Sequence, residues 1–161
     1  MVKRVAKPML GGNLMSASTI KPLETATAHS TGGRNGHSET DDGSVSVNLS
    51  VRKGMGGPGT PGTTTPEHLF AAGYAACFGG ALDFVASQHK VKLTDATVTA
   101  KVSVGPREGG GFGVAVEMKV ASPTLPTAEL RQLAEEAHEK VCPYSHATRG
   151  NIPFELKVEG A

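Results

Sequence analysis

The chain has 161 residues, a length that fits one domain, which buries about two thirds of the surface that its unfolded chain exposes. Its 16 Lys and Arg against 15 Asp and Glu give a formal net charge of +1, so bulk charge gives no support to nucleic acid as a partner. With no Trp and 4% aromatic residues, the core must be built from Val, Ala and Leu. Such a thin core, with few large side chains, favours oligomerisation.

Residues 1–19 are predicted to be a disordered tail ahead of a single domain at residues 20–161. They lack the apolar stretch of a signal peptide, and no run of the sequence approaches the roughly 18 apolar residues that cross a membrane. We therefore expect a cytoplasmic protein with no membrane partner. In that reducing compartment a permanent disulfide is not expected, whereas a transient catalytic disulfide is compatible with it.

Two strands are predicted before the first helix. In residues 20–28, apolar and polar residues alternate enough to predict the first strand. Residues 29–36 carry the Gly and Asn-Gly signals of a turn. Residues 43–51 form the second, because their apolar positions recur at every second residue and would face a core. These positions are Val45, Val47, Leu49 and Val51. The Gly-rich residues 53–65 then interrupt regular structure, and they lack the Gly-Lys-Ser/Thr of a phosphate loop.

A central helix is predicted from residue 66 to about residue 88. Thr65 is suited to cap it, Pro66 fits the first helical position, and Glu67 in the first turn interacts favourably with the helix dipole. An apolar stripe is flanked by alanines on the other faces. We therefore expect this helix to be buried on every side.

The second half of the chain is predicted to alternate between strands and one helix. Residues 96–104 and 113–120 form a hairpin whose valines face inward, residues 127–141 form a helix, and residues 154–158 form a last strand. The order ββ-α-ββ-α-β indicates an α+β fold, with antiparallel sheets packed around two central helices.

Two cysteines stand in unlike settings. Cys77 lies within the Ala-rich predicted helix, and Cys142 lies at the end of the second predicted helix. They are 65 positions apart, so only folding could bring them together. Such a pair is either an oxidation couple or two unrelated core residues, and each cysteine taken alone is more often inert core filler.

Three segments carry a resemblance to a known family. They are TGGRNG at residues 31–36, TPEHLFAAGYAACF at residues 65–78 and VCPYSHATRGN at residues 141–151. In order and spacing they resemble the organic hydroperoxide resistance (Ohr) branch of the Ohr/OsmC family, and the continuation after Cys142 favours Ohr over the OsmC branch. The resemblance covers residues 20–161, and the first 19 residues have no counterpart in it.

The resemblance implies a thiol peroxidase that reduces organic hydroperoxides to alcohols without a metal, haem or flavin cofactor. It assigns Cys77 as the peroxidatic residue, Arg34 and Glu67 as its electrostatic partners, and Cys142 as the resolving residue that forms a disulfide with Cys77. It also implies an OsmC-like, intertwined homodimer. The expected reductant is a dithiol, the dihydrolipoyl group of a lipoylated protein.

The residue types suit that chemistry. A thiol with an ordinary pKa of about 8.5 is only a few per cent thiolate at pH 7, so a thiol nucleophile needs assistance. Arg34 stays charged, and its planar fork can contact sulfur, oxygen and a carboxylate together. Without the resemblance, Arg34 would be a solvated turn residue and Glu67 a partner of the helix dipole.

Glu67 and Cys77 are not expected to share one small site within a chain. Ten helical residues correspond to a rise of about 15 Å and a rotation of about 280°. Either Glu67 comes from a partner subunit or Arg34 bridges the two residues. The first option agrees with the thin core and with the dimer that the resemblance implies.

Other candidates are open to two interpretations. Phe70, Tyr74 and Phe78 with Met55 are candidates for an apolar entrance for an alkyl or acyl hydroperoxide, and core packing is the alternative. The six histidines show no metal-ligand spacing, so no metal site is expected.

Two rival functions use the same cysteines. One is a cysteine hydrolase in which Cys77 works with a histidine, and the other is a redox sensor or apolar-ligand binder whose disulfide changes its shape. Catalytic turnover of peroxide with excess dithiol separates an enzyme from a sensor.

Overall fold

The computed structural model describes residues 19–161, and the predicted tail lies outside them except for residue 19. The strands are β1 (Ala28–Thr31), β2 (His37–Thr40), β3 (Ser46–Asn48), β4 (Thr97–Pro106), β5 (Phe112–Ala121) and β6 (Phe154–Glu159). The helices are α1 (Pro66–Gln88), α2 (Thr127–Glu136) and α3 (Pro143–Thr148), with 3-10 turns η1 (Gly33–Asn35) and η2 (Lys53–Met55) and the π-helical turn η3 (Ala137–Val141). The predicted α+β class is confirmed.

The strands form two separate sheets. β1, β2 and β3 pair in that order and antiparallel, and β4 pairs antiparallel with β5, with Val102 opposite Val116. β6 runs parallel to β5, with Leu156 opposite Met118, so the prediction of antiparallel sheets is wrong for this pair. The reason is the connection, because the helical crossover through α2, η3 and α3 returns the chain to the end at which β5 began.

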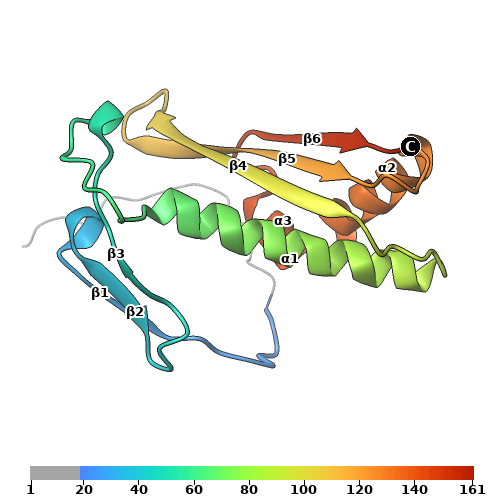
Figure 1. Ribbon diagram of the computed structural model, residues 1–161, viewed down its shortest axis with the longest axis horizontal. Helices are drawn as coiled ribbons and strands as arrows, with labels where there is room; N and C mark the ends of the chain where they lie inside the picture. The colour runs from blue at the N-terminus through green and yellow to red at the C-terminus, as the bar shows by residue number, and fades with distance from the viewer. Residues whose placement is uncertain (1–18) are drawn as a thin grey trace, which may run out of the picture.

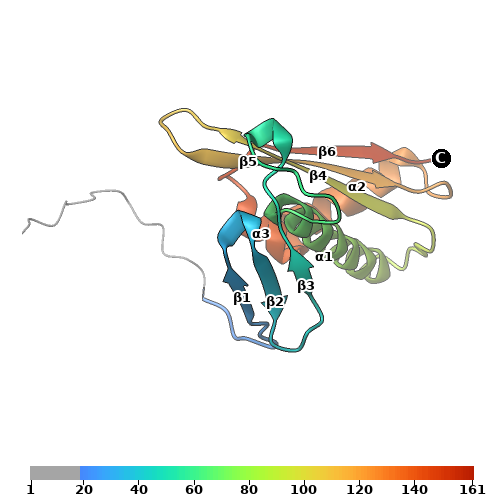
Figure 2. The same cartoon turned by 60° about the vertical axis from the view of Figure 1, so that its left-hand side comes forward.

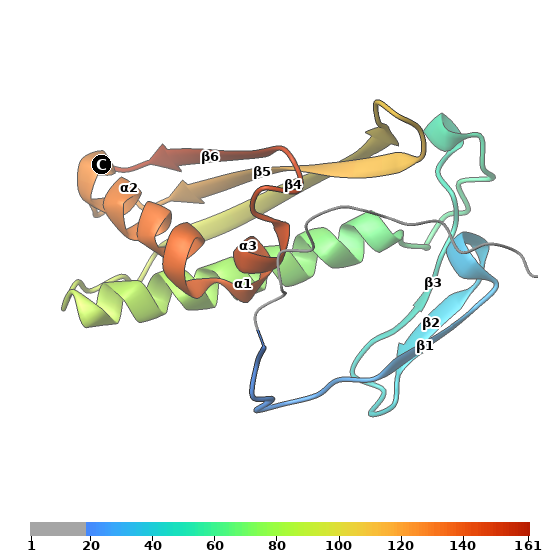
Figure 3. The same ribbon diagram turned by 180° about the vertical axis from the view of Figure 1, so that it is seen from behind.

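Figure 1 shows α1 running lengthwise along the sheet of β4, β5 and β6, while the sheet of β1, β2 and β3 stands apart near the N-terminal end of α1. The turned view in Figure 2 shows the same separation of the two sheets. From behind, in Figure 3, α2 and α3 lie against α1 on the side of β6. The core therefore lies between α1, α2 and the second sheet.

The core side chains come from the predicted inward faces. Val116, Met118 and Val120 of β5 are buried, and they pack with Leu130 and Leu133 of α2. The facing valines of β4 are half-buried against the same cluster. The hairpin prediction is thus confirmed, because strict alternation over ten residues places one face on the core.

The start and length of α1 are as predicted. The Thr65 side chain accepts a hydrogen bond from the backbone N–H of His68 at 3.3 Å, and Pro66 occupies the first turn. The expectation of burial on every side is wrong for a single chain. Ala72 and Ala76 are exposed, and Phe84 is 54% exposed, so one apolar face of α1 has no cover within the chain.

The length and composition of α1 would allow it to cross a membrane, which corrects the expectation that no segment comes near that length. Core helices pass the same test, because a helix that packs on several neighbours is apolar around much of its circumference. Here α1 contacts β4, α2 and α3, as expected of the central helix of this fold.

The N-terminal strands differ from the prediction. Residues 20–27 form no strand, and β1 takes the last residue of the predicted strand and three residues of the predicted turn. β2 at residues 37–40 was not predicted. These strands are rich in Ser, Thr and His and show no alternation of apolar residues. They form through backbone pairing with each other and not through burial of an apolar face. The strand predicted at residues 43–51 is shortened to β3. Before it, Asp42 accepts hydrogen bonds from Thr40 and Ser44 in a turn, and after it Leu49 forms only an isolated bridge, with Thr64.

The helix predicted at residues 127–141 is α-helical only to Glu136 and continues as the π-helical turn η3. The short helix α3 follows directly and was not predicted. Cys142 lies between these two elements, so the local backbone around it is made of one irregular turn and one six-residue helix.

Candidate active site

The fold brings the two cysteines together. The Sγ atoms of Cys77 and Cys142 lie 3.6 Å apart, and both thiols are free. Cys77 is partly exposed on α1, whereas Cys142 is only 1% exposed. A contact between sulfurs 65 positions apart makes them a pair in space and not two unrelated core residues. The more accessible sulfur is the one that the resemblance assigns to the peroxide.

The second cysteine is held by the elements on either side of it. Its N–H donates to the carbonyl oxygen of Ala137 at 2.8 Å, which closes η3. Its Sγ caps α3 by accepting from the backbone N–H of Ser145 at 3.5 Å, and Pro143 fits the first position of that helix. These two hydrogen bonds fix the place of the Cys142 sulfur between η3 and α3.

The turn η3 is held in place by contacts of residues that the sequence did not single out. The Arg149 side chain donates to the carbonyl oxygen of His138, and the His138 ring stacks on Phe154 with centroids 4.1 Å apart. The Nδ1 of His138 is buried and has no hydrogen-bond partner. Burial lowers the pKa of His138, and the charge of Arg149 lowers it further. π-Helical turns occur often at functional sites.

The thiol of Cys77 is not activated within a single chain. Burial raises its pKa, a backbone hydrogen bond from Tyr144 lowers it, and the neighbouring thiol of Cys142 raises it. No cation among the described residues contributes to this pKa. Since an ordinary thiol is already mostly protonated at pH 7, Cys77 would be a poor nucleophile in this environment.

The predicted cation is engaged elsewhere. Arg34 Nη2 lies 2.6 Å from Glu67 Oε1, and Arg34 Nη1 lies 3.0 Å from Glu67 Oε2. The guanidinium therefore donates two parallel hydrogen bonds to the carboxylate. The Glu67 side chain is 13% exposed and that of Arg34 is 43% exposed. Hydrogen bonding to Arg34 lowers the pKa of Glu67, and hydrogen bonding to Glu67 raises the pKa of Arg34.

The turn that carries Arg34 is built from the TGGRNG segment. A Cβ on Gly36 would overlap the carbonyl oxygen of Thr31, so this position has room only for glycine. The side-chain oxygen of Asn35 accepts from the backbone N–H of Val51 at 2.9 Å and ties the turn to the loop after β3. The motif therefore holds Arg34 in a fixed turn at the N-terminal end of α1.

Arg34 also lines an open groove of about 760 Å³. The other walls are the tip of the hairpin β4–β5, with Arg107 and the 72% exposed Phe112, and the segment at residues 151–153. Neither cysteine lines it. The structure thus shows two separate groups of candidate residues, the Arg34–Glu67 pair and the two thiols, and Arg34 does not bridge them within the chain.

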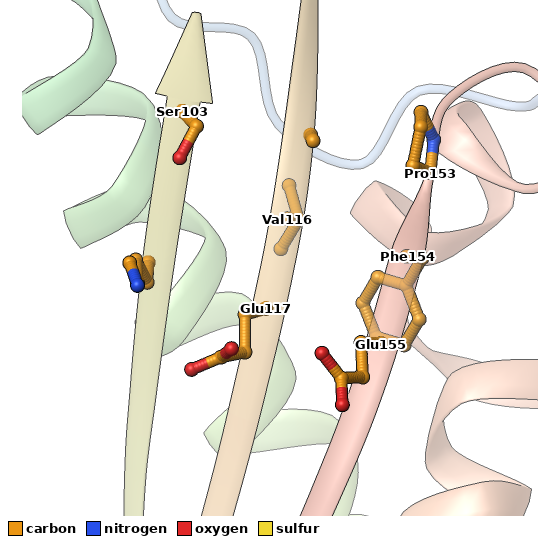
Figure 4. Close-up of a pocket in the computed structure, with 8 residues that line it drawn as sticks. Ser103, Val116, Glu117, Pro153, Phe154 and Glu155 are labelled. Carbon is orange, nitrogen blue, oxygen red and sulfur yellow. The ribbon is translucent and has the colours of Figure 1, made fainter.

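A smaller pocket, of about 250 Å³, lies on the sheet of β4, β5 and β6 (Figure 4). Its carboxylates, Glu117 and Glu155, are both paired with Lys157, whose Nζ lies 2.6 Å and 3.7 Å from them. None of the predicted site residues lines this pocket. Lys101 also lines the pocket, so the two carboxylates are balanced by two lysines, and no thiol is present.

The candidates for an apolar entrance fall into two groups. Tyr74 and Phe78 have no exposed surface and belong to the core, so they do not line an opening within the single chain. Phe70 is half-buried and stacks on Tyr144 with centroids 6.1 Å apart, and Met55 is 43% exposed on η2. Tyr144, which also bonds Cys77 through its backbone, was not predicted; its place in the VCPYSHATRGN segment was the available signal.

Within residues 19–161, no three side chains of His, Cys, Asp or Glu are grouped so that they could hold a metal ion. The candidate residues themselves are two thiols in contact and, apart from them, a guanidinium paired with a carboxylate.

Comparison with known proteins identifies the family. The model of the OsmC-like protein family matches residues 57–157. The organic hydroperoxide resistance protein of Xanthomonas axonopodis pv. citri (strain 306) is 48% identical over 143 residues, which cover 88% of this chain and 99% of that protein.

Two crystal structures confirm the OsmC-like fold. An organic hydroperoxide resistance protein from Elizabethkingia anophelis matches with a TM-score of 0.82 and 46% identity, over 88% of this chain and 100% of that one. The organic hydroperoxide resistance protein OhrB of Bacillus subtilis matches with a TM-score of 0.78 and 40% identity, over 85% and 99%. The chain therefore belongs to the OsmC-like family, in its branch of organic hydroperoxide resistance proteins.

Proposed function

We propose that this protein is a thiol-dependent peroxidase that reduces organic hydroperoxides to alcohols, with Cys77 as the attacking residue and Cys142 as the resolving residue. The observation that carries the proposal is the 3.6 Å separation of two free sulfurs of unequal exposure, in a member of the organic hydroperoxide resistance proteins. A disulfide requires the two sulfurs to approach to about 2.05 Å, which is a small movement from this starting point.

The proposed cycle has three steps. The Cys77 thiolate attacks one peroxide oxygen, the O–O bond breaks, and the alkoxide leaves as an alcohol after taking a proton, so that Cys77 becomes a sulfenic acid. The Cys142 thiol attacks that sulfur and water leaves, which gives the Cys77–Cys142 disulfide. An external dithiol then exchanges with the disulfide and becomes oxidised in its place. We propose a dihydrolipoyl group on a lipoylated protein as that dithiol.

We propose further that the active site is completed in a homodimer, by Arg34 and Glu67 of the second subunit. The support is electrostatic and geometric. Within the chain the Cys77 pKa is raised and not lowered, while Arg34 and Glu67 pair with each other in their own groove. Along α1, Glu67 and Cys77 are separated by a rise of about 15 Å. A second copy is the simplest source of a cation beside Cys77.

Surfaces that lack cover in the single chain agree with such a dimer. The sheet of β1, β2 and β3 has little buried surface, although a three-stranded sheet normally needs an apolar face packed on other elements. The open face of α1, with Ala72, Ala76 and Phe84, is a second uncovered apolar surface. A partner subunit lying on both would extend the thin core.

The same thiol pair would also serve a redox sensor, which oxidises once and does not turn over. Consumption of peroxide should therefore be followed with hydrogen peroxide, an alkyl hydroperoxide and a fatty-acid hydroperoxide, each with excess dihydrolipoamide or glutathione. We expect many turnovers with an organic hydroperoxide and dihydrolipoamide, and none in Cys77→Ser. Stoichiometric oxidation without turnover would favour the sensor, and full activity in Cys77→Ser would refute the mechanism.

A further inference from the structure

We propose that the Tyr74 hydroxyl is a positioning group for disulfide formation, which holds α3, and with it Cys142, against Cys77. The significance for peroxide turnover rests on the proposed function. The effect on the disulfide does not, because it concerns two thiols whose contact the structure shows.

Tyr74 lies on α1 three residues before Cys77 and has no exposed surface. Its hydroxyl lies 3.0 Å from Ser145 Oγ and 3.1 Å from Thr148 Oγ1, which are both on α3. The backbone N–H of Ser145 donates to Cys142 Sγ. A short path of hydrogen bonds therefore runs from the helix that carries one cysteine to the sulfur of the other.

The direction of these bonds follows from counting protons. Thr148 Oγ1 donates its proton to the carbonyl oxygen of Tyr144 at 2.8 Å, so toward Tyr74 it is an acceptor. The Tyr74 hydroxyl donates to Thr148 and, having no second proton, accepts from Ser145. Each of these hydroxyls is thus satisfied in one orientation, which makes the junction between α1 and α3 specific.

The backbone around Cys142 depends on hydrogen bonds of this kind to hold its position. α3 has six residues, too few for a helix that is stable by itself, so its position depends on its tertiary contacts. The preceding turn η3 is π-helical and adds little regular structure. The Tyr74 hydroxyl ties α3 to α1 from the buried side, as the packing of α3 against α1 in Figure 3 allows.

The placement matters because two reactions compete for the sulfenic acid of Cys77. Attack by Cys142 forms the disulfide and releases water, and a second peroxide instead carries Cys77 to sulfinic acid. The first reaction is intramolecular, and its rate depends on how often the Cys142 sulfur lies in position to attack. Loosening α3 would shift the partition toward sulfinic acid.

The test is Tyr74→Phe, which keeps the ring that packs on Phe70, Tyr144 and Phe154 and removes the hydroxyl. The disulfide is formed in a glutathione redox buffer without peroxide, and the effective concentration of the two thiols is measured. We expect a fall of about tenfold, the size that 1.4 kcal/mol of lost tethering gives. After treatment with an organic hydroperoxide, mass spectrometry should find a larger fraction of Cys77 as sulfinic acid.

Ser122→Ala is the matched control. Ser122 is 3% exposed between β5 and α2, and its hydroxyl donates to Asp95 at 3.0 Å, so this variant also loses a buried hydroxyl. It should lower the melting temperature without changing the effective concentration or the sulfinic fraction. Equal values in Tyr74→Phe and the control would overturn the proposal and leave the hydroxyl a purely structural group.

Two further variants keep the proposal testable if Tyr74→Phe does not fold. Ser145→Ala and Thr148→Val remove the partners of the hydroxyl, and the combined variant should show the same fall as Tyr74→Phe. A combined variant with wild-type effective concentration would also overturn the proposal. If no peroxide is turned over by the wild type, the proposed function fails, and the redox-buffer measurement still decides the role of Tyr74.

Discussion

Subunit complementation tests the geometry of the proposed site most directly. Cys77→Ser lacks the nucleophile, and Glu67→Ala lacks the carboxylate that Arg34 grips with bonds of 2.6 and 3.0 Å. If the site forms across an interface, a heterodimer of these variants contains one complete site, because the intact Cys77 of one subunit faces the intact Glu67 of the other. If the site forms within a chain, no heterodimer contains a complete site.

The expected recovery can be counted. Random exchange between equal amounts of two variants makes about half of the dimers heterodimers in a two-fold symmetric assembly, and half of the sites in those are complete. Peroxidase activity should therefore rise to about one quarter of the wild-type value, above the residual activity of Glu67→Ala. Differently tagged subunits and native mass spectrometry measure the exchange itself.

A second mixture supplies the control. Cys77 and Cys142 lie 3.6 Å apart within one chain, so Cys77→Ser mixed with Cys142→Ser should recover no sustained turnover. Verified exchange without recovery in the first mixture would refute the shared site, as would a monomer by light scattering at micromolar concentration. Recovery in the second mixture would show that the cysteines of different subunits react with each other.

Three further outcomes are expected. Cys142→Ser should consume about one peroxide per site and then stall or over-oxidise at Cys77, since no resolving thiol remains, and peptide mapping of the oxidised wild type that links Cys77 to another partner would contradict the pairing. Arg34→Ala should move the alkylation pH profile of Cys77 upward by about one unit or more, Arg34→Lys should rescue it poorly, and Arg131→Ala on α2 should leave it unchanged. Arg34 lowers the folded pKa of Glu67, so Glu67 should make wild type more stable than Glu67→Gln above the unfolded pKa of about 4.3, by about 1 kcal/mol or less because the Arg34 side chain is 43% exposed. In urea titrations at acid pH this difference should vanish as the pH falls through the lower folded pKa.

Local signals predicted the elements whose structure is decided locally. Thr65 and Pro66 predicted the start of α1, because capping and a fixed proline φ act within one turn. The hairpin β4–β5 followed from alternation that matches one buried face. β1 and β2 gave no such signal, because both are polar, β1 is exposed and β2 is only partly buried, and the two exist through their pairing with each other.

The site itself was predictable only in part. The resemblance pointed to both cysteines. Composition and spacing alone left open whether they are an oxidation couple or two unrelated core residues. The sequence left open whether Arg34 meets Glu67 within the chain, because that contact depends on where the turn η1 lies relative to α1. The contacts of Tyr144 and Ser145 with the sulfurs arise from α3, which is too short to show a helical period in the sequence.

The separation of the Arg34–Glu67 pair from the two thiols has a chemical consequence for the proposed peroxidase. In the single chain burial raises the pKa of the Cys77 thiol, although Cys142 already lies in contact with it. A guanidinium from a second copy would reverse the sign of the dominant effect, because a nearby cation favours the thiolate that burial disfavours. Reactivity toward peroxide would then appear only in the assembled protein. In an unassembled chain the Cys77 thiol would react slowly with peroxide. Dimerisation, which the small core favours, would then also control when Cys77 becomes reactive.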